Sequence, residues 1–434
     1  MSRSSRTLML GVVALVAIAL VIALTGGGGD PEVDAAPSTT TADPPDATTT
    51  TSTTTATTTT TTLDPRFVEL VERTSELIEN ATPEELAYRL VVTGLTGTDL
   101  AGRLRGTVGS VCVGGVFLTE SNNNWTPVDD PEAFRAALTT TGYDAWFESG
   151  CEFPPLITTD AELGSVVRVP VDSPAAAPDW TARYVSGEPY NVLLDLQEQV
   201  FDYATKLDDL GIDVNFGAVA DVATAPDHFM ARQGRTFGDD PGIVAALANA
   251  VVQGHCDAGI AATLKHFPNQ GATTEDPHRE RSTAIGGVDL WETTGRLPYE
   301  GTAAPLVMTG HIFMTDMDTE WPASLSPAIT TDLLRGELGY DGVVITDDLS
   351  TMRGASDIIA DPGDRAVAAI QAGADLVLFV DDRDIPRVVE ALAAEMEADP
   401  DFFMPRAQSA VRQVLRLHLG LREPELFPLC RPQG

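Results

Sequence analysis

The sequence predicts an α/β protein whose folded part is a single TIM-type (β/α)8 barrel of parallel strands. Short runs of apolar and β-branched residues recur along the chain, and helical patterns lie between several of them. These runs are continuously apolar, which is typical of parallel strands that are buried on both faces. The alternative is a doubly wound open sheet, but no glycine-rich phosphate loop opens a helix, and we therefore expect the barrel.

The chain begins with a segment that predicts export. Arg3 and Arg6 precede an apolar run over residues 8–24, and glycines occupy positions 26–29. Such a run, at about 1.5 Å per residue, is long enough for a thin bilayer. We therefore expect residues 1–29 to be a signal-anchor, a transmembrane helix in the cell membrane with the remainder of the chain outside. The alternative is a signal peptide that is removed before secretion.

Residues 30–64 predict a disordered linker. Between residues 35 and 63 the chain consists almost entirely of Thr, Pro, Ala and Asp. Such a segment buries too little apolar area to offset the entropy of ordering it. Residues 65–434 remain for the folded part, and this length suits one barrel domain.

The charge balance narrows the classes of partner. The chain has 27 basic and 64 acidic residues and a net charge of −37. A surface of this kind repels phosphate backbones, so we expect no nucleic-acid partner, and excess carboxylate commonly serves solubility. We expect a monomer.

Four cysteines fit an oxidising compartment. They can pair in three ways, and we favour Cys112–Cys151 with Cys256–Cys430, which joins neighbours and ties down the carboxy-terminal tail. No two cysteines are closely spaced, which argues against a zinc site, and the sequence predicts neither metal nor cofactor.

The individual elements follow from local patterns. After a helix over residues 65–81, the predicted strands cover residues 90–94, 110–117, 156–159, 213–216, 261–265, 306–308, 343–346 and 376–380. Predicted helices cover residues 190–210, 241–256, 326–338 and 364–372. The third of these has Ser326 as its cap, Pro327 in its first turn and Gly339 beyond its end.

Polar residues follow several predicted strands, where a barrel places its active site. They are Asp160, Lys265 with His266, His311, and Asp347 with Asp348. Asp347 suits a catalytic carboxylate, although an aspartate here can instead cap a following helix, and Asp348 is the better candidate for the cap.

The loop after Lys265 carries Asp276 and His278. A carboxylate beside an imidazole fixes its tautomer and makes a usable general acid and base. An exposed loop pair without function is the alternative for these two residues. A metal site built from His255, His266, His278 and His311 is a third possibility, but their spacing is not that of close ligands.

Eight short segments, in order, resemble glycoside hydrolase family 3, and specifically its bacterial β-N-acetylglucosaminidase branch. The resemblance extends from about residue 86 to about residue 421. The segments are Thr159-Asp-Ala-Glu-Leu-Gly, Gly211-Ile-Asp-Val-Asn-Phe-Gly-Ala-Val-Ala-Asp-Val, Arg235-Thr-Phe-Gly-Asp-Asp-Pro, Lys265-His-Phe-Pro, Asp276-Pro-His, Val307-Met-Thr-Gly-His, Pro322-Ala-Ser-Leu-Ser and Asp341-Gly-Val-Val-Ile-Thr-Asp-Asp-Leu.

The resemblance implies a retaining exo-β-N-acetylglucosaminidase that acts on glycans outside the membrane, such as cell-wall fragments or chitooligosaccharides. Asp347 matches the family's nucleophile, and Asp276 with His278 matches an acid/base dyad in which histidine replaces the usual carboxylic acid. Four further residues match those that hold hydroxyls of the terminal sugar: Asp160, Arg235, Lys265 and His266.

The chain also departs from the family pattern. Residues 268–273 read Pro-Asn-Gln-Gly-Ala-Thr instead of Pro-Gly-His-Gly-Asp-Thr, Glu162-Leu-Gly replaces Glu-Gly-Gly, and one residue is inserted after the nucleophile. The altered residues 269–272 leave two alternatives open. One is a phosphorylase that uses phosphate in place of water, and the other is a wall-glycan-binding protein without catalysis.

Overall fold

The fold comes from a computed structural model that describes residues 64–95, 102, 104, 111–119, 135, 136, 138 and 151–430. The chain divides into two compact units, Met1–Val71 and Glu72–Gly434, and the second contains every strand described below. The expected anchor and nearly all of the expected linker lie outside the described residues. Within the described ranges, no helix is both long and apolar enough to cross a membrane.

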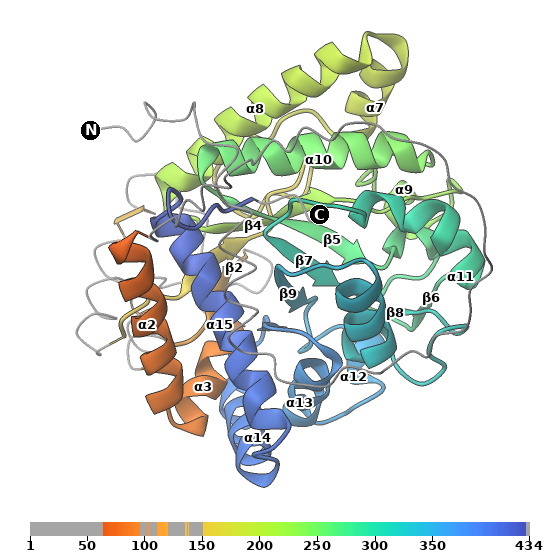
Figure 1. The fold of residues 1–434 in the computed structure, drawn as a ribbon. Helices are drawn as coiled ribbons and strands as arrows, with labels where there is room; N and C mark the ends of the chain where they lie inside the picture. Colours follow the sequence, from red (N-terminus) through yellow and green to blue (C-terminus); the bar gives the residue numbers. More distant parts are fainter. Residues whose placement is uncertain are drawn as a thin grey trace, which may run out of the picture. The chain divides into compact units, whose positions relative to one another are not determined.

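Eight parallel strands form an almost closed barrel (Figure 1). In chain order they are β1 (Val91–Gly94), β2 (Gly115–Leu118), β3 (Leu156–Thr159), β4 (Val214–Val219), β5 (Ala261–Phe267), β7 (Leu306–Thr309), β9 (Val343–Thr346) and β10 (Val377–Phe379). From β1 to β9 each barrel strand pairs with the next barrel strand along the chain, and β1 also pairs with β10. A parallel bridge between Ile345 and Leu376 links the remaining edges. This arrangement confirms the predicted barrel and excludes the open sheet.

In the second unit, helices surround the barrel strands, and several of them connect one strand to the next (Figure 1). The α-helices are α2 (Pro65–Asn80), α3 (Pro83–Arg89), α7 (Ala177–Ser186), α8 (Pro189–Leu210), α9 (Phe229–Arg232), α10 (Pro241–Ala258), α11 (Gly287–Leu290), α12 (Arg353–Ser356), α13 (Pro362–Ala372), α14 (Ile385–Ala398) and α15 (Phe403–Arg422). The 3-10 helices are η3 (Gln270–Ala272), η5 (Leu297–Tyr299), η6 (Ala323–Leu325) and η8 (Asp382–Asp384), and the π-helices are η4 (Trp291–Gly295) and η7 (Ala328–Glu337). Strands β6 (Ser282–Thr283) and β8 (Ile312–Phe313) form a separate parallel pair.

Capping residues set both ends of helix α10. Asp240 caps α10 by accepting from the N–H groups of Gly242 and Ile243, and Pro241 occupies the first turn. Gly259 closes the same helix at φ 83°, a left-handed conformation that a residue with a side chain adopts at a cost.

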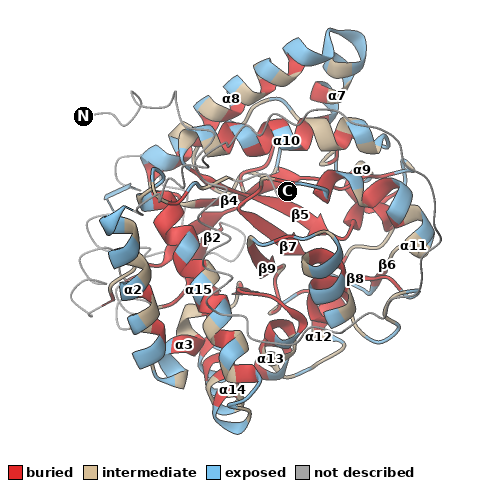
Figure 2. Ribbon diagram, in the orientation of Figure 1, coloured by how far each residue is buried: buried red, intermediate tan, exposed pale blue. Residues whose placement is uncertain are grey.

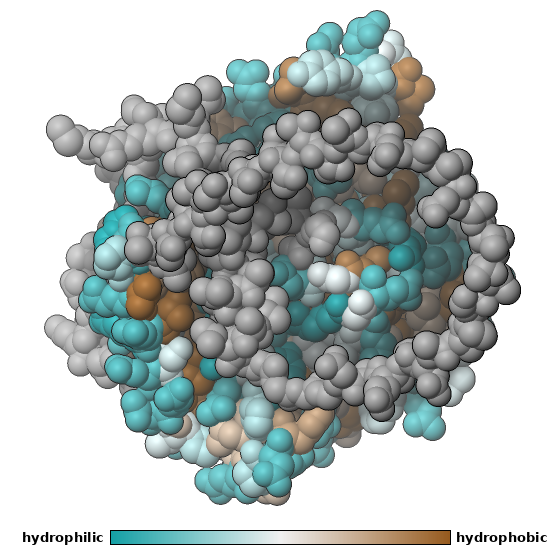
Figure 3. Space-filling model, in the orientation of Figure 1, coloured by the Kyte–Doolittle hydropathy of each residue, from teal (hydrophilic) through white to brown (hydrophobic). Residues whose placement is uncertain are grey.

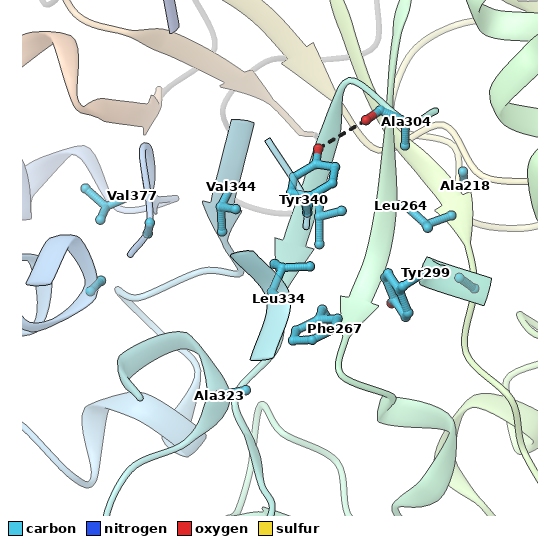
Figure 4. Close-up of a cluster of buried hydrophobic side chains, with 14 of the residues drawn as sticks. Ala218, Leu264, Phe267, Tyr299, Ala304, Ala323, Leu334, Tyr340, Val344 and Val377 are labelled. Atoms are coloured by element: carbon cyan, nitrogen blue, oxygen red, sulfur yellow. Dashed lines mark hydrogen bonds between the residues drawn. The ribbon is translucent and has the colours of Figure 1, made fainter. Parts of the chain in front are cut away.

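Alternate strand residues pack into two different hydrophobic clusters. Val343 and Ile345 of β9 lie in one cluster with residues from neighbouring strands, whereas Val344 packs with the surrounding helices. Every residue of β9 is buried, and the same holds for the other barrel strands (Figure 2). Figure 4 shows part of the outer cluster, where the Tyr340 hydroxyl donates to the carbonyl of Ala304 at 3.1 Å. Burial on both faces explains the continuous apolar runs in the sequence.

The surface is polar, and the cysteines are paired. Hydrophilic residues cover much of the described surface visible in Figure 3, as the net charge of −37 leads one to expect. Disulfide bonds join Cys112 to Cys151 and Cys256 to Cys430, with Cα atoms 5.5 and 6.0 Å apart. These are the two pairs that the sequence favours.

Two predicted elements differ in detail. Strand β2 begins only at Gly115, because the backbone bends at Val111 and Gly114 and is irregular between them, and Ser110 lies outside the described residues. Residues 328–337 form a π-helix, and Pro327 rather than Ser326 occupies its cap position. The Ser326 hydroxyl donates to Asp318 at 2.7 Å and accepts weakly from the N–H of Ile329.

Candidate active site

Asp347 lies directly after β9, at the carboxyl end of the barrel strands. Its N–H donates to the carbonyl of Thr309 on β7, and its Oδ1 accepts from the N–H of Asp348 at 2.8 Å. Burial raises the pKa of the Asp347 carboxyl, but nearby histidines and the Asp348 N–H outweigh this and hold the pKa below its usual value. The histidines are His266, His311 and His278. Asp347 is therefore a carboxylate, as a nucleophile must be.

Asp348 has a different role from its neighbour. Its Oδ1 accepts from the N–H groups of Ser350 and Val380, and its Oδ2 accepts from the N–H of Thr351. These bonds fix the turn that follows β9 and tie it to the end of β10. Asp348 therefore caps a turn, while α12 begins only at Arg353.

Four side chains form a charged cluster, and we call Asp160, Glu162, Arg235 and Lys265 the four-charge cluster. Lys265 Nζ lies 2.7 Å from Asp160 Oδ1 and 2.8 Å from Glu162 Oε1. Arg235 binds Glu162 through two bonds, Nε to Oε2 at 2.9 Å and Nη2 to Oε1 at 2.7 Å. Two positive and two negative groups thus fix one another's positions.

The cluster is charged although it is buried. The side chains of Lys265 and Glu162 are only 3% and 2% exposed. Burial opposes the charged form of Glu162, yet Arg235 and Lys265 hold its pKa far below the ordinary value. Burial likewise opposes the charge on Lys265, but Asp160 and Glu162 raise its pKa above the ordinary value. The donors of Lys265 and Arg235 are therefore positioned before any ligand binds.

Two buried histidines lie at the ends of β5 and β7. Nδ1 of His266 is 2.7 Å from Asp221 Oδ2, so the carboxylate orients the ring. Nδ1 of His311 is 2.8 Å from the Ser324 hydroxyl and its Nε2 is 2.9 Å from the carbonyl of Asp348. Burial lowers the pKa of His311. His311 therefore supports the turn beneath Asp347.

Residues 268–281, which we call the 268–281 loop, follow β5 and carry Asp276 and His278. Nδ1 of His278 is 2.9 Å from Asp276 Oδ1, which also accepts from the N–H of His278. Burial raises the pKa of Asp276, but its bonds to His278 outweigh this and lower it. The His278 side chain is 60% exposed. The pair is thus assembled, with its imidazole open to solvent.

Residues 91–417 match the family described as Glycosyl hydrolase family 3 N terminal domain. The chain belongs to this family. It is accordingly a glycoside hydrolase, as the resemblance of its short motifs led us to expect.

Individual family members resemble the chain over most of its folded part. A Beta-hexosaminidase of Stenotrophomonas maltophilia (strain K279a) is 30% identical over 294 residues, which are 67% of this chain and 82% of that protein. The structure of a family 3 β-N-acetylglucosaminidase from Paenibacillus sp. str. FPU-7 has a TM-score of 0.69 and 29% identity over 79% of this chain and 63% of that one. The crystal structure of a Beta-N-acetylhexosaminidase from Beutenbergia cavernae DSM 12333 has a TM-score of 0.64 and 30% sequence identity. The match covers 78% of this chain and 99% of that one.

The strand-end residues of this family 3 chain come together as two groups. Asp160 and Lys265 are in direct contact, and Arg235 joins them through Glu162. His266 and His278 belong with Asp347, on which both act electrostatically. Among the described residues, no set of three or more His, Cys, Asp or Glu side chains is arranged to hold a metal ion.

Sequence reasoning did not assign a role to Glu162 or to Asp221. Asp221 offers the same signal as Asp347, because it is a polar residue that closely follows a buried strand, β4. Glu162 offers no such signal. Only the structure shows that Arg235, 73 residues away in sequence, lies against it.

Proposed function

We propose that the chain is a retaining exo-β-N-acetylglucosaminidase that removes terminal β-linked N-acetylhexosamine from extracytoplasmic glycans. The observation that carries the proposal is the position of Asp347 directly after β9, where its Oδ1 accepts from the N–H of Asp348 and nearby histidines lower the pKa of its carboxyl group. Hexosaminidases among the similar proteins support the choice of sugar. Cell-wall fragments and chitooligosaccharides are the expected substrates.

The reaction takes two steps. Asp347 attacks the anomeric carbon and forms a glycosyl ester, while His278 gives its proton to the departing glycosidic oxygen. Water then attacks the same carbon, its proton passes to His278, and the Asp347 carboxylate is released. Asp276 holds the His278 ring in the tautomer that this transfer needs.

The remaining polar residues bind the terminal sugar. Lys265 and Arg235 are charged donors fixed by Glu162, and Asp160 is an acceptor whose side chain is 22% exposed. His266, oriented by Asp221, completes the set. Donors held in place before binding lose little entropy when a sugar hydroxyl arrives.

We also propose where the enzyme acts. Residues 1–29 anchor it in the membrane, residues 30–64 form a linker, and residues 65–434 form the barrel domain outside the cell. Two disulfide bonds support an oxidising compartment.

Turnover of an aryl N-acetyl-β-glucosaminide tests the activity. We expect wild type to release the aryl group and the β-anomer of the sugar first, as followed by proton NMR. If wild type turned the substrate over no faster than Asp347→Ala, the proposed activity would be wrong. The chain would then be the glycan-binding protein without catalysis. An α-anomer as first product would overturn the retaining mechanism.

Adding inorganic phosphate separates hydrolysis from phosphorolysis. The hydrolase yields free sugar at all phosphate concentrations. A sugar 1-phosphate product would show that phosphate replaces water in the second step.

A further inference from the structure

The 268–281 loop is clamped at its start by the side chain of Asn269. The Asn269 carboxamide accepts from the N–H of Val222 at 2.9 Å and donates to the carbonyl of Val222 at 3.1 Å. Its Oδ1 also accepts from the N–H of Gly271 at 3.1 Å. Asn269 is only 4% exposed. One side chain thus pairs with both backbone groups of Val222, as a neighbouring strand would.

Asp221, the residue before Val222, holds the next part of the loop. Its Oδ1 accepts from the N–H groups of Gln270 at 2.6 Å and Gly271 at 3.2 Å. Its Oδ2 is the atom that orients His266. The segment after β4 therefore fixes both a sugar-binding side chain and the start of the loop.

Gly271 shows how closely the loop lies on this segment. A Cβ atom at Gly271 would lie 2.5 Å from the carbonyl oxygen of Val222, which is too close for any side chain. On its other side, the carbonyl of Gly271 is 2.7 Å from Nδ1 of His228. The loop is therefore held at residues 269–271, whereas His278 at its far end is exposed.

We propose that Asn269 is a positioning residue for proton transfer. By anchoring the start of the loop to Val222, it determines where Asp276 and His278 can reach the glycosidic oxygen. The inference rests on the proposed function. The family pattern has glycine at this position, and glycine has no side chain that could make these bonds. Under this proposal, the departure from the family pattern at residues 269–272 contributes to catalysis through Asn269.

Asn215 supplies a matched control. It is fully buried, and its carboxamide makes the same pair of bonds to the backbone of Ala161, at 2.9 and 2.8 Å. Ala161 lies between Asp160 and Glu162 of the four-charge cluster and not in the loop. Asn215→Ala and Asn269→Ala therefore each remove a pair of carboxamide–backbone bonds and one further bond, which joins Asn215 to His255 and Asn269 to Gly271.

The experiment measures kcat and KM of both variants with N-acetyl-β-glucosaminides whose leaving groups differ in pKa, from dinitrophenol to a second sugar. A displaced acid harms the reaction only when the leaving group needs a proton. For Asn269→Ala we expect kcat to fall roughly tenfold on the disaccharide and less than about twofold on the dinitrophenyl glycoside. For Asn215→Ala we expect a similar loss on every substrate.

Limited trypsin digestion gives a second readout that does not depend on turnover. The exposed Arg279 and Arg281 lie in the same loop, and we expect faster cleavage there in Asn269→Ala than in Asn215→Ala. If Asn269→Ala does not fold, Asn269→Ser, which retains a hydroxyl, takes its place.

Equal losses on all substrates together with unchanged cleavage would overturn the inference and leave the proposed function standing. An inactive wild type would instead overturn the proposed function. The two failures are thus distinguishable.

Discussion

The four-charge cluster and the 268–281 loop place their charged groups in opposite environments. In the cluster, Lys265 and Glu162 are nearly inaccessible, and each is held by more than one partner. In the loop, His278 is 60% exposed and is held by Asp276 of the same loop. In the proposed mechanism, the groups that bind the sugar are therefore fixed within the barrel, whereas the group that transfers the proton must be positioned by the loop.

The largest effect is expected at Asp347, the proposed nucleophile. Asp347→Ala removes the nucleophile, and we expect kcat to fall by about 10⁴-fold or more. The residue contributes little to packing, so the circular dichroism spectrum should match that of wild type. A collapsed spectrum would instead assign Asp347 a structural capping role.

His278→Ala tests the loop side of the comparison. We expect a loss of about 10²- to 10³-fold on natural glycans and a much smaller loss on aryl glycosides with good leaving groups, which need little protonation. The free energy of unfolding should change by less than about 0.5 kcal/mol, because the side chain is exposed. Equal losses on both substrate types would argue against an acid role.

Glu162→Gln tests the cluster side. It leaves Lys265 and Arg235 with one carboxylate fewer, and removing one partner from a buried ion pair costs about 3–5 kcal/mol of stability. We expect KM to rise roughly tenfold or more on every substrate, with urea unfolding reporting the lost stability.

The control for Glu162→Gln is Asp195→Asn. It breaks an exposed ion pair between Asp195 on α8 and Arg183 on α7. Such a pair is worth less than about 1 kcal/mol, and KM should not change. If both variants lose the same stability, the cluster is no more important than a surface pair.

The last prediction concerns the pH dependence of stability and a histidine outside the candidate site. Burial lowers the pKa of His255 to about 4, and its ring is bonded to Asn215 and Val251 in the neutral form. The unfolded chain binds a proton there below about pH 6.5, so stability is lost as pH falls from 6.5 to 4, by roughly 3 kcal/mol at most.

Urea unfolding at pH 7 and pH 4.5 measures this loss. His255→Gln should reduce the pH dependence, and the part that remains includes His418, whose pKa burial lowers to about 3. A pH dependence that does not change in His255→Gln would contradict the assignment.

Much of the barrel could be predicted from the sequence, because parallel strands buried on both faces leave uninterrupted apolar runs. The predicted strands at 156–159 and 343–346 coincide with β3 and β9. The helices α14 and α15 were not predicted, although their apolar residues recur every three or four positions, which is the pattern of an amphipathic helix. The π-helix η7 could not be predicted, because hydrogen-bond register within a helix leaves no pattern in residue type.

In the candidate site, local sequence patterns were enough to single out Asp347 and the pair Asp276–His278. They did not reveal the residues that hold these side chains or the loop in place. The family resemblance identified Arg235 and Lys265, yet nothing in the sequence shows that Glu162 lies between them. The clamp by Asn269 depends on contact with Val222, 47 residues earlier. Contacts between distant residues arise only in the folded chain.

The most direct test of the account is to identify the residue that carries the glycosyl group. A fluorinated N-acetylglucosaminide with a good leaving group forms the ester faster than water removes it. Intact-mass measurement should then show one added glycosyl residue on wild type and none on Asp347→Ala, with peptide mapping placing it on Asp347. Turnover without any added mass, or a label on another carboxylate such as Asp160, would contradict the account.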